Sequence, residues 1–126
     1  MIDRLKISKR ASDKIIALQG STNLTRNILV RLAIGLSLRD ESQPEPRNHL
    51  TAGGLEINRA ILTGDYDFIY KSLMIQHAGR ELTDEEYFPK LFNDHLERGI
   101  DLLEAEYQHA GNYERFAVNL LKIVEE

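Results

Sequence analysis

The sequence predicts a mainly α-helical, compact domain with a short strand at its N-terminus. Three observations predict this class. Apolar residues recur at helical spacing through most of the chain, apolar–polar alternation is confined to its first residues, and no apolar run approaches the roughly 20 residues of a membrane helix. The length of 126 residues, with 42% hydrophobic and 29% charged residues, suits one soluble domain over residues 1–126. No secretory signal is recognisable.

The predicted strand covers the first alternating segment, residues 2–8. Leu5 and Ile7 fall on one side of it, and Arg4 and Lys6 fall on the other. Alternation over so few residues is typical of a short, half-buried strand.

Two helices follow the strand. The first is predicted over residues 9–19, with Ser8 as its N-cap and Gly20 ending it. The second begins after the capping residue Thr25 and runs to about Leu38. The chain therefore begins with the order strand, helix, helix.

The second helix is apolar on nearly its whole circumference. Val30 and Ile34 lie opposite the main apolar stripe, which contains Ile28, Leu29, Leu32, Ala33 and Leu36. A helix of this kind is buried on both sides, so the pattern favours a subunit interface on it.

A long surface loop is predicted over residues 40–54, because Pro44, Pro46 and the pair Gly53–Gly54 interrupt any helix there. Residues 55–63 alternate only loosely and suggest a short extended segment.

A helix is then predicted from Gly64 to about Ala78, and its spacing indicates that Phe68, Ile69, Leu73 and Met74 point inward.

The remaining chain predicts two more helices. Thr83 and Glu86 have the spacing of a capping box, and Pro89 predicts a kink or a restart soon after it. Asn112 is placed to cap a final amphipathic helix. The apolar stripes of these two helices contain Leu91, Phe92, Leu96, Ile100 and Leu103 in the first, and Phe116, Leu120 and Ile123 in the second.

Charge is divided unevenly along the chain. Residues 1–39, the basic head, hold eight basic and two acidic side chains, although the whole chain carries a net charge of −4. Residues 55–126 form an acidic helical body. This division suits a basic face supported by an acidic body, and it equally suits a fold in which the head forms salt bridges with the body.

No catalytic or cofactor-binding arrangement is recognisable. There is no cysteine, which excludes disulfides, thiolate metal sites and cysteine nucleophiles. Phosphate-binding glycine motifs are missing as well. His95 with Asp94 and Glu97 could be drawn as a metal cluster, but we interpret each as an exposed helix residue, since catalytic zinc needs three protein ligands. We therefore expect no enzyme activity, no metal and no cofactor.

The basic head supplies candidate DNA contacts. Arg10 and Lys14 are four residues apart on one helix face, and Arg26 lies at a helix start, where free N–H groups favour a phosphate. An ordinary solvated surface would account for each of these residues taken alone. The candidate residues are Lys6, Lys9, Arg10, Lys14, Arg26 and Arg31.

Several stretches make the sequence similar to a known family. They are Leu24–Ala33 with Leu36–Leu38, Glu56–Arg59 with Leu62–Asp67, and His95–Leu103. In their order and spacing they resemble DndE, the small subunit of the bacterial DNA phosphorothioation system, from the strand to about residue 104.

The resemblance implies a cytoplasmic, mainly helical, non-enzymatic homotetramer that binds double-stranded DNA and prefers nicked duplex. It also implies partners within the DNA sulfur modification complex, which replace a non-bridging phosphate oxygen with sulfur. The implied DNA contacts are basic surface residues, a role carried here to the six candidates above.

Two alternative functions remain open. The strand–helix–helix order is also that of ribbon-helix-helix repressors, in which paired strands of two subunits read the major groove. The basic head could instead dock onto an acidic protein, which would make the chain an interaction scaffold without DNA binding.

Overall fold

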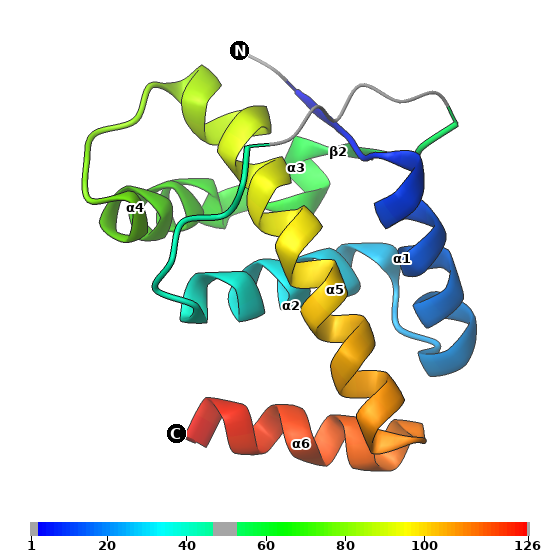
Figure 1. Ribbon diagram of the computed structural model, residues 1–126. Helices are drawn as coiled ribbons and strands as arrows, with labels where there is room; N and C mark the ends of the chain where they lie inside the picture. Colours follow the sequence, from blue (N-terminus) through cyan, green and yellow to red (C-terminus); the bar gives the residue numbers. More distant parts are fainter. Residues whose placement is uncertain (1–2, 47–52, 126) are drawn as a thin grey trace.

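The protein is mainly helical, and its helices surround one apolar core (Figure 1). The structure is a computed structural model that describes residues 3–46 and 53–125. In chain order the elements are β1 (Arg4–Lys6), α1 (Lys9–Thr22), α2 (Arg26–Arg39), β2 (Glu56–Asn58), α3 (Arg59–Leu62), the single turn η1 (Gly64–Tyr66), α4 (Asp67–Ala78), the turn η2 (Glu86–Leu91), α5 (Phe92–Ala110) and α6 (Tyr113–Glu125).

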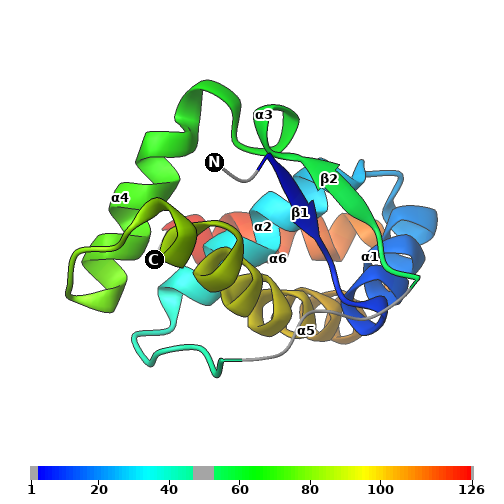
Figure 2. The same cartoon turned by 90° about the horizontal axis from the view of Figure 1, so that it is seen from above.

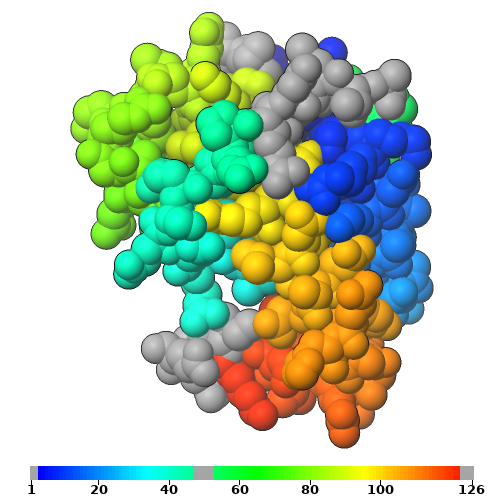
Figure 3. All heavy atoms as spheres, viewed as in Figure 1, coloured from blue at the N-terminus to red at the C-terminus, as the bar shows by residue number. Residues whose placement is uncertain are grey.

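Helices α2 and α5 cross at the centre of the molecule. The β-ribbon and α1 lie on one side of the crossing and α4 on the other, while α6 lies at the far end of α5 (Figures 1 and 3). The crossing is close because Gly99 has no side chain: a Cβ there would lie 1.9 Å from the carbonyl oxygen of Ala33. None of the described helices is long and apolar enough to cross a membrane.

A strand is present where the sequence predicted one, but it is shorter than predicted: β1 ends at Lys6, Ile7 and Ser8 lie beyond it, and Ile2 lies outside the described residues. Strand β1 pairs antiparallel with β2 of the same chain, with Leu5 opposite Ile57, and the two lie side by side in Figure 2. Leu5 is fully buried. The Asn93 side-chain amide of α5 also donates to the Lys6 carbonyl at 3.1 Å. A ribbon-helix-helix protein would instead pair this strand with its copy in a second subunit.

The predicted start of α1 is confirmed and its predicted end is wrong. The Ser8 hydroxyl caps the helix by accepting from the Ala11 N–H at 3.1 Å. The helix continues past Gly20 to Thr22, because Asn23 provides the left-handed turn (φ 61°) that ends it. Gly20 adopts no positive φ and is simply a helical residue.

Helix α2 is capped by Thr25, as predicted, but its apolar circumference is explained within one chain. Val30 and Ile34 are both fully buried in the protein's own core. The burial of these two side chains is therefore accounted for without a second subunit.

The connection after α2 is irregular in its described parts, residues 40–46 and 53–55. The rest of the predicted loop lies outside the described residues. Leu55 joins the ribbon, since its carbonyl accepts from the Ile7 N–H at 2.9 Å. The extended segment predicted over residues 55–63 is correct only for β2, because Asn58 caps the short helix α3 directly after it.

Helix α4 is correctly located, but its orientation was predicted wrongly. Met74 is buried, whereas Phe68, Ile69 and Leu73 are 69%, 41% and 43% exposed. The apolar side chains of α4 outnumber the positions that face the core, so most of them border solvent.

The caps and the break predicted for the last two helices are confirmed. Thr83 and Glu86 bond each other's backbone N–H groups, both at 3.1 Å. Phe88 has a non-helical backbone before Pro89, and α5 starts afresh at Phe92. Asn112 accepts from the Arg115 N–H at 2.9 Å at the start of α6.

Candidate nucleic-acid interface

The exposed face of β1 carries two of the basic residues in the head. Arg4 and Lys6 point outward while Leu5 points into the core. The Arg4 guanidinium lies 3.5 Å from the Glu56 carboxylate on the neighbouring strand. Lys6 is exposed, and within the described part of the chain it forms no ion pair. Lys6 is therefore available to a phosphate.

Lys9 starts α1 and is engaged along its own helix. Its ammonium group lies 2.7 and 2.9 Å from the two carboxylate oxygens of Asp13, one turn later. Both side chains are more than half exposed. An exposed pair of this kind contributes little stability, so a phosphate could replace the carboxylate at small cost.

Arg10 and Lys14 are brought together by α5. The Arg10 guanidinium lies 2.7 Å from Asp101 and also bonds the Glu97 carboxylate, while the Lys14 ammonium lies 2.8 Å from Asp101. Lys14 additionally pairs with Glu104 at 3.0 Å. We call these five residues the α1–α5 ion network.

The network shifts the pKa values of Arg10, Lys14 and Asp101 toward their charged forms. Hydrogen bonds to Asp101 are the largest cause that raises the pKa values of Arg10 and Lys14. Burial alone would raise the pKa of Asp101, but hydrogen bonds from both cations lower it below its ordinary value. Two cations thus face three carboxylates. For Arg10 and Lys14 the structure shows the salt bridges between head and body that the sequence left as one alternative.

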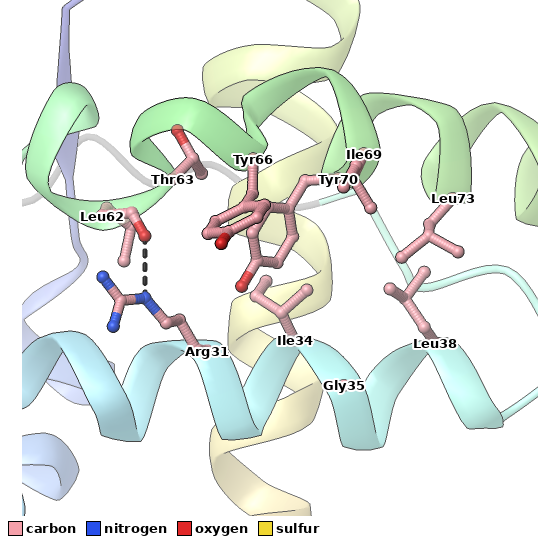
Figure 4. Close-up of a pocket in the computed structure, with 10 residues that line it drawn as sticks. All are labelled: Arg31, Ile34, Gly35, Leu38, Leu62, Thr63, Tyr66, Ile69, Tyr70 and Leu73. Atoms are coloured by element: carbon pink, nitrogen blue, oxygen red, sulfur yellow. Dashed lines mark hydrogen bonds between the residues drawn. The ribbon is translucent and has the colours of Figure 1, made fainter.

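Arg26 and Arg31 lie on α2 in different surroundings. Arg26 is partly exposed at the helix start, and it has no ion pair among the described residues. Arg31 instead donates from Nε to the Leu62 carbonyl at 2.9 Å and from a terminal nitrogen to the Ile61 carbonyl at 2.8 Å. Figure 4 shows its guanidinium at the end of α3. Arg31 therefore caps α3 and also borders solvent.

Burial corrects the interpretation of one cluster on α5. His95, Asp94 and Glu97 are 0%, 5% and 3% exposed, so our interpretation of them as exposed helix residues was wrong. Asp94 and Glu97 serve the protein's own contacts: Glu97 accepts from the Ser8 hydroxyl and from Arg10. Among residues 3–46 and 53–125, no three His, Asp or Glu side chains are arranged to hold a metal ion.

His95 belongs to a buried polar cluster that sequence reasoning missed. Its Nδ1 lies 2.7 Å from the Ser37 hydroxyl, which also accepts from Arg98 at 2.9 Å. The ring of His77 packs edge-on against His95, with centroids 4.9 Å apart. Arg98 and His77 both bond the Asp40 carbonyl and so fasten the start of the loop to α4 and α5.

Arg59 is a second residue whose role was not predicted. The residue is only 5% exposed. Its guanidinium donates hydrogen bonds to the carboxylates of Asp67 and Asp84 at 2.8 to 3.1 Å. It also lies 4.5 Å from the ring centre of Phe88. The pairing of Arg59 with Asp67 ties the end of β2 and α3 to the start of α4.

Comparison with known sequences identifies one family. The sequence model described as DndE, DNA sulphur modification protein DndE, matches residues 4–111, which run from β1 to the end of α5. Helix α6 lies beyond this match. No curated protein matches the chain.

Solved structures with this fold agree with that match. The crystal structure of DndE from Escherichia coli B7A, involved in DNA phosphorothioation modification, superposes with a TM-score of 0.63 and is 24% identical, over 79% of this chain and 96% of that one. A DndE variant with two glycine-to-lysine substitutions, also described as involved in DNA phosphorothioation, gives 0.65 and 21%, over 83% of this chain and 99% of that one.

Proposed function

The chain belongs to the DndE family of DNA sulphur modification proteins, and on this premise we propose that it is a DNA-binding accessory subunit of the phosphorothioation machinery. The observation that carries the proposal is the family match, which includes every element of the basic head and the helix that supports it. In this proposal the chain is a cytoplasmic homotetramer without catalytic activity. Its partners are double-stranded DNA and the other subunits of the complex, and sulfur chemistry takes place on those subunits.

Binding is electrostatic in this proposal. Cations that contact phosphates release counterions, and phosphate contacts carry no sequence information directly, so binding is largely independent of sequence. The six basic candidates take part in different ways. Lys6 and Arg26 contribute first, because neither is held in an ion pair among the described residues.

The other candidates contribute under different conditions. Lys9 exchanges one exposed carboxylate for a phosphate. Arg10 and Lys14 keep their carboxylate partners and act mainly by holding α1 against α5. Arg31 keeps its contacts with α3 and presents only its remaining N–H groups.

A preference for nicked duplex is part of the proposal. A nick makes the duplex easier to bend, so a rigid protein surface can contact phosphates on both sides of it. A gapped duplex of the same sequence is expected to bind as well as the nicked one. Weaker binding to the gapped duplex would contradict this explanation of the preference.

The test is a fluorescence anisotropy titration with nicked and intact duplexes of identical sequence at several salt concentrations. We expect the logarithm of affinity to fall with the logarithm of salt, by about 0.9 per contacted phosphate. The double variant Lys6→Glu with Arg26→Glu is expected to weaken binding and to lower this slope by about 2. The variant Arg115→Glu with Lys122→Glu, which makes the same charge change on α6, is the matched control and should bind like the wild type.

A third variant separates direct contacts from support. Arg10→Gln with Lys14→Gln removes the cations of the α1–α5 ion network without placing new acids beside Asp101. We expect it to reduce stability more than DNA affinity. The α1–α5 ion network also supports the scaffold alternative, because cations that are paired with carboxylates attract phosphates only weakly. That alternative would replace the proposal if the wild type bound no DNA at low salt.

A further inference from the structure

An apolar groove runs along the surface between α2 and α4. Its volume is about 520 Å³. Figure 4 shows the side chains of the two helices gathered around it, with Tyr66 and Tyr70 above and Ile34 and Leu38 below. The groove lies apart from β1 and α1, which carry most of the proposed DNA contacts.

The spacing of the lining residues shows what shape the groove fits. On α2 they are residues 31, 34, 35 and 38, and on η1 and α4 they are residues 66, 69, 70 and 73. Both sets have the spacing i, i+3, i+4, i+7 of a face that packs against another helix. The two helices therefore resemble half of a four-helix bundle that lacks its other half.

The groove contains almost no charge. Arg31 is the one charged side chain among its lining residues, and two of its nitrogens already bond carbonyls of α3. Interfaces between permanently associated subunits are apolar and poor in charged residues at their centre, more so than transient ones. The chemistry of the groove therefore favours a permanent partner.

The exposed apolar area is also of the size that an interface needs. Tyr66, Ile69 and Leu73 are 65%, 41% and 43% exposed, and the adjacent Ile61 is 61% exposed. These four side chains expose roughly 400 Å² in each copy, and each partner of a standard interface buries ~800 Å², of which about 60% is apolar. These side chains therefore supply most of the apolar share.

We propose that a second copy of this chain occupies the groove, so that α2 and α4 of two copies pack around a twofold axis as a four-helix bundle. A twofold interface uses the same patch on both subunits, so the patch must be complementary to itself. This patch has both the groove and protruding side chains at its edge, and the protruding side chains of one copy would enter the groove of the other. The inference rests on the homo-oligomer in the proposed function and assigns a surface to it.

The first experiment measures mass by light scattering during size-exclusion chromatography of the full chain. Ile69→Glu and Leu73→Glu place a charge in the groove and are expected to halve the mass or reduce it further. Phe68→Glu is the matched control: Phe68 is 69% exposed on the same helix but does not line the groove, so its mass should equal that of the wild type.

A second variant blocks the groove without adding charge. A Cβ on Gly35 would meet no atom within 4 Å, so Gly35→Trp leaves the single chain room to fold while its ring fills the groove. It should reduce the mass as Ile69→Glu does. Circular dichroism and the melting temperature of each variant confirm that its chain is folded.

Cross-linking identifies the occupant. The chain has no cysteine, so Ile69→Cys introduces the only reactive thiol. A short bismaleimide should join two copies of Ile69→Cys efficiently and two copies of Phe68→Cys poorly. Equal cross-linking of the two variants would overturn the proposal.

The remaining outcomes are equally decisive. The proposal would be overturned if folded Ile69→Glu and Gly35→Trp had the same mass as the wild type. It would also be overturned if the wild type stayed monomeric at every concentration, and the groove would then be assigned to a different protein. DNA binding is measured separately. An oligomer that uses this groove but binds no DNA would refute the proposed function and keep this inference.

Discussion

Arg59 shows how much depends on one buried charge. Its guanidinium donates four hydrogen bonds to two carboxylates, and its face packs on Phe88. The hydrogen bonds with Asp84 and then Asp67 raise the pKa of Arg59 above its ordinary value. The guanidinium thus joins α3, α4 and the segment before η2 at one point.

Replacing Arg59 should therefore be costly. Arg59→Leu leaves Asp67 and Asp84 without their cation and is expected to lower the free energy of unfolding by about 3 kcal/mol. Arg59→Lys keeps the charge but loses the two-pronged geometry, so its loss should be intermediate. Urea titrations of both variants measure these differences, and a Leu variant as stable as the Lys variant would contradict the role of the ion pairs.

His95 makes stability depend on pH near neutrality. Burial, with smaller contributions from His77 and Arg98, lowers the pKa of His95 to about 3. Its unfolded-state pKa is about 6.5, so between these values the unfolded chain binds one proton more than the folded chain. Stability should therefore fall as pH drops below 6.5, by up to about 1.4 kcal/mol per pH unit.

The variant His95→Asn tests this dependence. Its amide can form a hydrogen bond with the Ser37 hydroxyl in place of the His95 Nδ1, but it does not titrate. Unfolding free energies measured at pH 5, 6, 7 and 8 should be flatter for the variant than for the wild type. An unchanged slope would assign the dependence to another group.

Among the elements, the contact of α2 with α5 depends on a missing side chain. A Cβ on Gly99 would meet the Ala33 backbone at 1.9 Å, so Gly99→Ala must push the two central helices apart. We expect it to cost about 3 kcal/mol. Gly20→Ala is the control in open space within α1, where alanine should add about 0.5–1 kcal/mol of stability. Thermal unfolding of both variants measures the contrast.

Phe116 is the one fully buried side chain among residues 113–122 of helix α6. It packs edge-on against Tyr107 of α5, with ring centroids 5.4 Å apart. Phe116→Ala should release α6 while the rest of the molecule stays folded. Hydrogen exchange is then expected to lose protection over residues 113–125 only, whereas protection lost in α2 as well would show that α6 is part of the central core.

Local signals in the sequence predicted local structure well, and they failed where a partner comes from far along the chain. The caps Ser8, Thr25 and Asn112 were correct because a cap depends on a few adjacent residues. The pairing of Arg10 with Asp101 joins residues 91 positions apart, which no spacing rule reaches. Periodicity likewise defined an apolar face on α4 without telling whether that face borders the core or a groove.

At the scale of the whole molecule, carboxylates hold the fold together and make it sensitive to acid. Hydrogen bonds from Arg59 lower the pKa values of Asp67, where burial opposes them, and of Asp84, and those from Arg10 and Lys14 do so for Asp101. Groups with lowered folded-state pKa values stabilise the protein above about pH 4, and this contribution is lost as pH falls through those folded values.

An acid titration followed by circular dichroism should therefore show unfolding below about pH 4, beyond the gentler loss due to His95. Asp84→Asn should reduce the dependence on pH in this acid range, since it removes one of the contributing carboxylates. A variant with the wild-type acid profile would contradict this assignment.

The N-terminal strand is held by partners made much later during synthesis. The Lys6 carbonyl accepts from Asn93, which is synthesised 87 residues later, and the Asp3 carbonyl accepts from the Arg59 N–H. A ribosome releases the chain from its N-terminus, so β1 has its full set of partners only after α5 has emerged. In an unfinished chain Arg4 and Lys6 are consequently not yet held in place on β1. Binding of DNA through them would require the completed protein.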